Sequence, residues 1–318
     1  MRIIRRPDLH SVTQGTALTI GKFDGIHLGH TQLFREVALA AETNRLIPTV
    51  VTFEPHPKEF FNPSFKLDRI ATLRNRIISM SNCGIEQVCI LPFNKAMADL
   101  SPLAFVHHIL LGHLKAKHIW VGDDFQFGAQ RAGNVTLLKV LGETEGFTVH
   151  DLPEVQSMGA RVSSSNIREA LKAGEIQKAV CMLGHPLMYS GRVIHGKKLG
   201  RTLGFPTLNM RIKGRASALT GILAVWVHGL SEKPLPAVAS LGTRPTIGHC
   251  HTLLLETHIP NWQGNAYGQL IHIEVLAHLR PEIRFDSIEA MKQQMHIDTQ
   301  QALTLLAQHN PQITNTGC

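Results

Sequence analysis

Several features that mark other protein classes are scarce or missing in this sequence of 318 residues. Its five cysteines include no CxxC pair, so neither a disulfide framework nor a thiolate zinc site is indicated, and we expect reduced, mostly buried thiols. No apolar run approaches the ~18 residues that a membrane span needs. The N-terminal arginines are followed by polar residues rather than by the apolar core of a secretory signal. We therefore expect a cytoplasmic protein without a membrane partner.

Aromatic residues are also few, at 6% of the chain, while basic residues outnumber acidic ones by 32 to 24. The net charge of +8 suits a polyanionic partner, either a nucleic acid or the phosphates of a nucleotide. Between Arg192 and Arg215 there are seven basic residues and no acidic one. Phe205 is the only Phe, Tyr or Trp in that stretch, so a surface for stacking bases is poorly supplied and we expect no nucleic-acid partner.

The first part of the chain alternates short apolar strands with helical patterns, which indicates an α/β domain with a doubly wound parallel sheet. A length of 318 residues suits two domains, and this pattern ends near Leu183. Ligand sites in such sheets lie beyond the carboxyl ends of the strands. The expected strands are 17–23, 48–53, 87–91, 118–121 and 147–150, and the expected helices are 31–43, 69–81, 103–114, 135–145, 164–172 and 176–183.

After residue 184 the sequence changes to glycine-rich loops and short strands without intervening helices. That pattern predicts an antiparallel β-barrel followed by one C-terminal helix. We therefore expect two domains, residues 1–183 and residues 184–318. The expected strands of the second are 222–228, 236–240, 252–258 and 270–277, and the expected helix is 287–309.

The segment Gly21–His30, with the sequence GKFDGIHLGH, lies where the first buried strand ends and the first helix begins. Free backbone N–H groups and the positive end of the helix dipole favour phosphate at such a position, and glycines let a ligand approach the backbone. His27 and His30 are three residues apart and could contact one phosphate group, stabilising charge that develops on it. An ordinary strand-to-helix turn with two incidental histidines is the alternative.

A second segment, Val162–Arg168, places serine hydroxyls at the start of a helix with Arg168 in its first turn. On its own it is as compatible with an ordinary N-cap as with a second phosphate site. Together the two segments resemble the HxGH and Ser/Thr-rich motifs of the adenylyl/cytidylyl transferase superfamily. Thr52–Pro57 (TFEPHP) and Gly122–Gly128 (GDDFQFG) resemble its flavin-directed branch, the N-terminal half of the prokaryotic bifunctional riboflavin kinase/FMN adenylyltransferases, or FAD synthetases.

The second half carries its own motifs. Gly191–Lys198 (GRVIHGKK) nearly matches a P-loop, but Lys198 replaces the Ser/Thr that would reach Mg²⁺, so a P-loop kinase is rejected. Leu199–Asn209 (LGRTLGFPTLN) instead resembles the LGR…GFPTxN segment of riboflavin kinases. A carboxylate inside an apolar strand, as in Leu255–His258 (LETH), is unusual unless it faces solvent or performs chemistry.

The resemblance implies an enzyme that phosphorylates riboflavin with ATP to give FMN and then adenylylates FMN with ATP to give FAD and pyrophosphate. It implies ATP and Mg²⁺ as cofactors and riboflavin, FMN and ATP as small-molecule partners. The alternative left open is a nucleotidyltransferase for another phosphorylated substrate, with a regulatory or nucleic-acid-binding barrel.

The resemblance also implies a role for each matching residue. The catalytic residues would be Glu256, as the general base of the kinase, with His27 and His30 in the transferase; the metal ligands would be Thr207 and Asn209; and the flavin-binding residues would be His56, Asp124 and Phe125. The nucleotide-binding residues would be Gly21, Phe23, Asp24, Gly25, Gly29, Ser163, Ser164, Ser165, Arg168, Gly196, Lys197 and Gly200.

Overall fold

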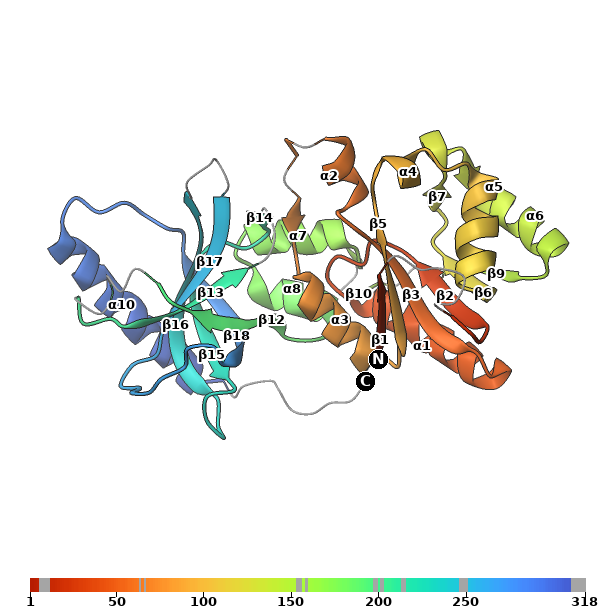
Figure 1. Ribbon diagram of the computed structural model, residues 1–318. Coiled ribbons are helices and arrows are strands. Elements are labelled where there is room, and N and C mark those ends of the chain that lie inside the picture. The colour runs from red at the N-terminus through yellow and green to blue at the C-terminus, as the bar shows by residue number, and fades with distance from the viewer. Residues whose placement is uncertain are drawn as a thin grey trace. The chain divides into compact units, whose positions relative to one another are not determined.

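The structure is a computed structural model that describes residues 1–5, 12–62, 64–65, 67–152, 156–157, 160–196, 200, 203–212, 216–245 and 251–309 (Figure 1). It divides into two compact units. Among the described residues, the first comprises those within 1–65 and 77–156, and the second comprises those within 67–76 and 157–309. The predicted limits of the two functional domains, 1–183 and 184–318, stay a prediction.

The first unit is built on a six-stranded parallel sheet with the strand order β1-β5-β3-β2-β6-β9. This arrangement confirms the predicted parallel α/β fold. The central strand β2 is buried along its whole length, as strands covered on both faces are, whereas β1 at the edge is mostly exposed. The strands are β1 (Arg2–Arg5), β2 (Thr16–Ile20), β3 (Ile47–Glu54), β5 (Gln87–Pro92), β6 (Ala116–Val121) and β9 (Thr148–Asp151).

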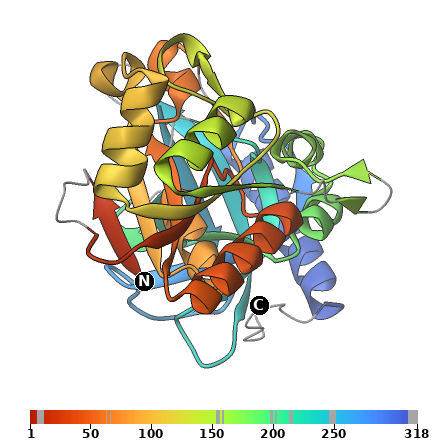
Figure 2. The ribbon, with the colours of Figure 1, turned by 90° about the vertical axis from the view of Figure 1, so that its right-hand side faces the viewer.

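Helices and short hairpins connect these strands. Helix α1 packs along β2 and β3 (Figure 2). Its C-cap Arg45 is left-handed, and α6 ends on the left-handed Gly146, which carries no Cβ penalty. The helical elements are α1 (Leu28–Asn44), α2 (Pro57–Phe61), α3 (Leu73–Asn82), α4 (Lys95–Ala98), α5 (Pro102–Ala104), η1 (Phe105–His113), η2 (Ala129–Arg131) and α6 (Val135–Glu145), and the hairpin strands are β7 (Gln126–Phe127) and β8 (Gly133–Asn134).

The second unit is a closed antiparallel barrel with the strand order β12-β13-β17-β16-β15-β18, and α10 packs on β15 and β16 (Figure 1). The predicted barrel and C-terminal helix are thereby confirmed. The barrel strands are β12 (Leu187–Ile194), β13 (Thr207–Ile212), β15 (Gly221–His228), β16 (Leu235–Pro245), β17 (His251–His258) and β18 (Leu270–Arg280), and the helices are α7 (Ser164–Lys172), α8 (Ile176–Leu183) and α10 (Ile288–Ala307). Short strands are β4 (Asp68–Arg69), β10 (Gln156–Ser157), β11 (Ala160–Arg161) and β14 (Ala216–Ser217).

Some predicted elements differ from the structure. The helix expected over 69–81 begins only at Leu73, because Thr72 caps it: its hydroxyl accepts the Asn75 backbone N–H at 3.1 Å. Asp68–Arg69 instead pair with β14. The helix expected over 103–114 widens into a π-helix at Phe105–His113, which apolar spacing does not distinguish from an α-helix. Strands β1, β12 and β13 were not predicted. Among the described residues, no helix is long and apolar enough to cross a membrane.

Candidate active sites

The turn between β2 and α1 holds the two histidines of the first motif. His27 is the N-cap of α1, and its Nδ1 atom accepts the His30 backbone N–H at 3.4 Å. Their imidazole rings stack, with centroids 3.6 Å apart and planes inclined by 18°. Gly25 has φ = +73°, and its carbonyl lies 3.1 Å from Nδ1 of His30. The structure thus brings both rings to the N-terminus of a 17-residue helix, where an anion is favoured.

These contacts set the protonation of the two rings. Burial lowers the pKa of His30 well below its usual 6.5, and the neighbouring His27 lowers it further, while the hydrogen bond to Gly25 opposes both effects. His30 is therefore neutral near pH 7, and its proton lies on Nδ1 because the Gly25 carbonyl only accepts. Because Nδ1 of His27 accepts a hydrogen bond, the proton of that ring lies on Nε2. A phosphate bound beside the rings would favour their protonated forms.

The remaining residues of this motif shape the turn. Phe23 has φ = +47°, and its ring meets the His30 ring edge-on at 5.0 Å. A Cβ atom on Gly21 would collide with the Phe23 ring, so that position favours glycine. Asp24 is buried, and Gly29 lies in the first turn of α1. Contact of these residues with a nucleotide stays a prediction.

The predicted flavin-binding residues follow the strands on either side of β2. His56 comes after β3, and Asp124 and Phe125 come after β6; because these parallel strands are neighbours, all three residues lie at the edge of the sheet that carries the histidine turn. His56 caps α2, where its Nδ1 accepts the Lys58 backbone N–H at 3.1 Å. The Phe125 ring stacks on Phe127 with centroids 5.4 Å apart.

Sequence reasoning missed an aromatic cluster at the same edge. Phe53 and Phe93, at the ends of β3 and β5, and Phe60 and Phe61 on α2 make edge-on contacts with centroids 5.3–5.8 Å apart. Phe61 is 68% exposed, although an aromatic ring normally gains from burial. In a chain with few aromatic residues, the phenylalanines flanking the TFEPHP segment were a signal that could have been used.

The serine segment belongs to the second unit, which the structure describes separately from the histidine turn. Ser163 is the N-cap of α7, and its Oγ accepts the Asn166 backbone N–H at 3.2 Å. Ser164 and Ser165 begin the helix, and Ser165 is exposed. Arg168 donates from Nε to the Asp68 backbone carbonyl at 3.1 Å. Ser163 is thus a helix cap, and its binding of phosphate stays a prediction.

The barrel brings Thr207, Asn209 and Glu256 to one face. Thr207 and Asn209 are two positions apart on β13, so their side chains point the same way. Asn209 lies opposite Glu256 on β17, and Glu256 lies opposite Ser240 on β16. Directly opposite residues share a face of the sheet. Strand register therefore places a hydroxyl, an amide oxygen and a carboxylate side by side.

The glycine positions of this motif are tightly packed. A Cβ atom on Gly196 would collide with the Asn209 amide, and one on Gly200 would collide with the Phe205 carbonyl. The Gly200 carbonyl accepts the Phe205 backbone N–H at 2.7 Å, which closes the turn leading into β13. Lys197 lies outside the described residues.

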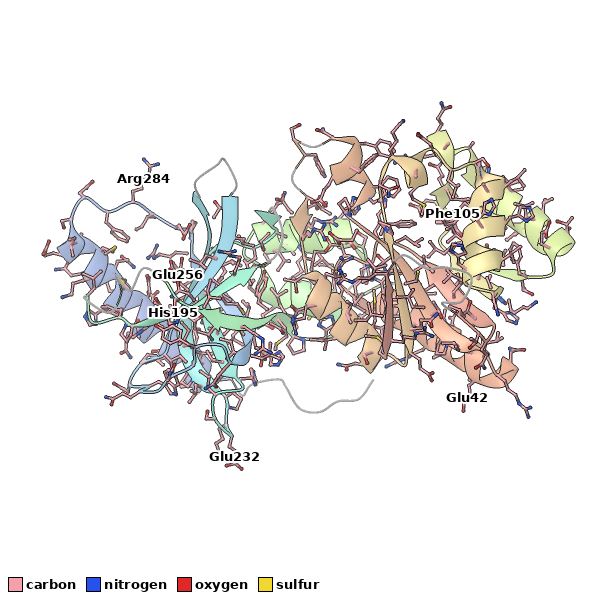
Figure 3. The ribbon with its side chains drawn as sticks, viewed as in Figure 1. Glu42, Phe105, His195, Glu232, Glu256 and Arg284 are labelled. Carbon is pink, nitrogen blue, oxygen red and sulfur yellow. The ribbon has the colours of Figure 1, made fainter. Side chains whose placement is uncertain are left out.

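Two cavities open beside these residues. The larger, of about 670 Å³, lies over the face that carries Glu256, and the smaller, of about 340 Å³, lies beside Trp262 and Tyr267; Thr207 lines both. Both volumes lie in the usual range for small-molecule sites. Figure 3 labels Glu256 on the barrel and Arg284 on the segment leading to α10. The lining supplied by that segment and by α10 was not predicted from the sequence; it includes Arg284, Phe285, Met291, Met295 and Asp298.

The donors on this face fit a particular kind of metal. In the part of the chain that the structure describes, no group of three or more His, Cys, Asp or Glu residues is placed to hold an ion. Thr207 and Asn209 offer hydroxyl and amide oxygens, which suit Mg²⁺. Mg²⁺ is usually held by one or two protein groups together with phosphate oxygens and water. The donor set therefore fits a magnesium ion that arrives with a nucleotide.

Comparisons with known proteins agree with this geometry. Residues 9–166 match the FAD synthetase family model, and residues 183–306 match the riboflavin kinase model. The bifunctional riboflavin kinase/FMN adenylyltransferase of Escherichia coli K12 is 38% identical, covering 94% of this chain and 96% of its own. The protein of the same description from Haemophilus influenzae is 38% identical, covering 95% and 98%.

Among solved structures, a crystal structure described as a macrolide-efflux protein from Streptococcus pneumoniae superimposes with a TM-score of 0.76. It is 28% identical to this chain, and the match covers 94% of this chain and 97% of that one. The shared fold therefore extends over nearly the whole length of both chains.

Proposed function

This chain belongs to the family of bifunctional riboflavin kinase/FMN adenylyltransferases, and from that premise we propose which of its residues perform each reaction. The chain phosphorylates riboflavin with ATP to give FMN, and it transfers AMP from ATP to FMN to give FAD and pyrophosphate. Its substrates are riboflavin, FMN and ATP, with Mg²⁺ as the usual metal. The alternative of another phosphorylated substrate has no support in the comparisons.

The adenylyltransferase is assigned to residues 1–183 and the kinase to residues 184–318. The matches to the two family models, at residues 9–166 and 183–306, support this assignment. We expect the protein to act in the cytoplasm, where ATP is made available, and to bind small molecules rather than nucleic acid.

In the kinase, Glu256 is the general base. Its carboxylate takes the proton from the terminal ribityl hydroxyl while that oxygen bonds to the γ-phosphorus and the bond to the ADP oxygen breaks. Riboflavin occupies the larger cavity, which contains Glu256, and ATP occupies the smaller one. The shared residue Thr207 supports this arrangement, because the two reacting groups must meet.

In the kinase, the segment before β13 is assigned the binding of the ATP phosphates. Gly196 and Lys197 contact the ATP phosphates, and Gly200, which lines the larger cavity, contacts them where the two cavities meet at Thr207. Thr207 and Asn209 would hold Mg²⁺. When bound, Mg²⁺ neutralises charge on the phosphate oxygens. The collision that any side chain on Gly196 would cause with Asn209 supports a role for close backbone approach there.

In the adenylyltransferase, a phosphate oxygen of FMN attacks the α-phosphorus of ATP and pyrophosphate leaves, with no covalent enzyme intermediate. His27 donates a hydrogen bond from Nε2 to the oxygens on which charge develops, and His30 does so from its own Nε2 once the bound phosphates have favoured its protonated form. Gly21, Phe23, Asp24, Gly25 and Gly29 bind the nucleotide beside them. Ser163, Ser164, Ser165 and Arg168 bind the departing pyrophosphate.

The flavin ring of FMN is assigned to the same edge of the sheet. His56, Asp124 and Phe125 bind it, together with the exposed Phe61 of the aromatic cluster. A flat aromatic ligand gains from offset or edge-on contact with such rings, which supports the assignment.

A time course tests the proposal. The full-length protein is incubated with riboflavin, ATP and Mg²⁺, and the flavins are separated by chromatography. FMN should rise before FAD. FMN without FAD would contradict the assignment of the histidine turn, and no product from either riboflavin or added FMN would contradict both assignments.

A further inference from the structure

The turn at residues 205–207 forms a partition between the two cavities of the second unit. Phe205 lines the larger cavity, Pro206 lines the smaller one, and Thr207 lines both. Groups bound in the two cavities therefore meet at this turn. Any shift of the turn would change the distance and angle between them.

His258 lines the larger cavity and contacts the partition from β17. It lies opposite Thr207 in the pairing of β13 and β17. Its Nδ1 atom is 3.0 Å from the Pro206 carbonyl oxygen, and because a carbonyl only accepts, Nδ1 must carry the proton. Its ring also meets the Phe205 ring at 5.1 Å, with the planes inclined by 61°. One side chain thus contacts two of the three residues of the partition.

Helix α10 holds the same turn from the other side. The His296 ring meets the Phe205 ring edge-on, with centroids 4.7 Å apart. Phe205 is buried. Met295, the residue before His296 on α10, lines the larger cavity. Phe205 is therefore fixed between β17 and α10, while Pro206 depends on its hydrogen bond to His258.

We propose that His258 is a positioning residue for phosphoryl transfer, which acts by fixing the Pro206 carbonyl and with it the Thr207 hydroxyl relative to Glu256. The inference rests on the roles proposed above for Thr207 and Glu256. Misplacing reacting groups by about 1 Å can cost roughly 100-fold in rate without a matching loss of binding. His258 itself exchanges no proton and bonds to no substrate in this account.

Two substitutions in the full-length chain separate positioning from simple support of the fold. His258→Ala removes the donor, whereas His258→Asn keeps an N–H close to the place of Nδ1. For His258→Ala we expect the kcat of the kinase to fall about 30- to 100-fold. The Kd of riboflavin, measured by flavin fluorescence without Mg²⁺, should change less than about 3-fold. His258→Asn should recover most of the kcat.

A second measurement, backbone hydrogen exchange, reports how firmly the partition at residues 205–207 is held. Hydrogen exchange at the backbone N–H groups of residues 207 and 208 should be faster in His258→Ala than in the unmodified protein and should be slowed again in His258→Asn. Adenylylation of added FMN serves as the control and should be unchanged in both variants.

Two results would overturn the inference. The first is an unchanged kcat in His258→Ala. The second is an equal loss of kcat and of riboflavin binding in both variants, since that outcome means only structural support. Failure of the proposed function is recognised separately: full kinase activity in Glu256→Gln would refute the role of Glu256, whatever His258 does.

Discussion

The two units carry their reactive groups on different structural elements, a strand-to-helix turn in the first and the strands of a barrel in the second. In the first, His27 and His30 lie in a turn at the end of a buried parallel strand, and the helix that follows supplies backbone N–H groups. In the second, Thr207, Asn209 and Glu256 lie within antiparallel strands, and register alone aligns them. The first site is local in sequence, while the second needs strands about 50 positions apart to pair correctly.

The two sites also differ in how their surroundings affect the charge of the reactive groups. At the histidine turn, burial disfavours the charged form of His30, so a bound phosphate must supply the negative charge that lets this ring take a second proton and donate from Nε2. The barrel site is a cavity of about 670 Å³ that is lined by the partly buried Glu256. The two sites should therefore fail independently when their own residues are changed.

The largest effect is expected at the barrel site. Glu256→Gln keeps the shape of the side chain but removes the base, so riboflavin phosphorylation should fall by about 10²–10⁴-fold. Adenylylation of added FMN should be unaffected. Steady-state assays of the two half-reactions measure both, with the exposed Glu232→Gln as the matched control (Figure 3). Parallel loss of both activities, with the fold intact, would refute separate sites.

The first site should show the reverse pattern. His30→Ala removes one donor to the α-phosphate, and FAD formation should fall by about 10²–10³-fold while FMN accumulates. Chromatography of the flavins formed from riboflavin measures both. His108→Ala, at an exposed histidine of η1, is the control and should leave both reactions intact. Normal FAD formation by His30→Ala would remove this residue from the mechanism.

A third prediction concerns what holds α10 to the barrel. Arg280 on β18 donates two hydrogen bonds to Asp298 on α10, at 2.9 and 2.6 Å, and the Asp298 side chain is only 3% exposed. Asp298→Ala leaves a buried charge unpaired, so the free energy of unfolding of the second unit should fall by about 3 kcal/mol. Chemical denaturation measures it.

Glu175→Ala breaks an exposed pair with Lys178 in the same unit and is the control for that experiment. It should lower the free energy of unfolding of the second unit much less than Asp298→Ala does, because exposed pairs contribute little. Equal effects of the two substitutions would show that the Arg280–Asp298 pair contributes no more than a surface pair.

The smallest effect is a pH dependence of stability. Because the pKa of His30 is lowered in the folded state, the unfolded chain binds a proton at a higher pH than the folded one. Stability should therefore fall as the pH drops from about 6.5 toward the folded-state pKa, by at most about 1.4 kcal/mol per pH unit from this group. His30→Asn should flatten the slope in denaturation curves, while His108→Asn should not. An identical slope in all three proteins would contradict the burial of His30 as its cause.

The same contrast explains what the sequence could predict. The GKFDGIHLGH segment directly follows β2 and contains the start of α1, so the order of strand, turn and helix was foreseeable, although the predicted strand ran three residues too far and the predicted helix began three residues late. Strands β12 and β13 were missed because glycines and a proline obscure their alternation, and with them the pairing of Asn209 with Glu256. Met291 and Met295 of α10 line the cavity because of tertiary packing, and no local sequence pattern at these residues predicts that role. The fold of both halves was predicted because strand–helix alternation and its absence extend over many residues.

Complementation between two variants, each of which lacks only one of the two activities, tests the separation of sites most directly. His30→Ala and Glu256→Gln are mixed and supplied with riboflavin, ATP and Mg²⁺, and FAD is followed over time. Neither variant alone should make FAD at an appreciable rate, whereas the mixture should, because FMN released by the first is a substrate for the second. A mixture that makes no FAD, although the first variant releases FMN, would contradict the account.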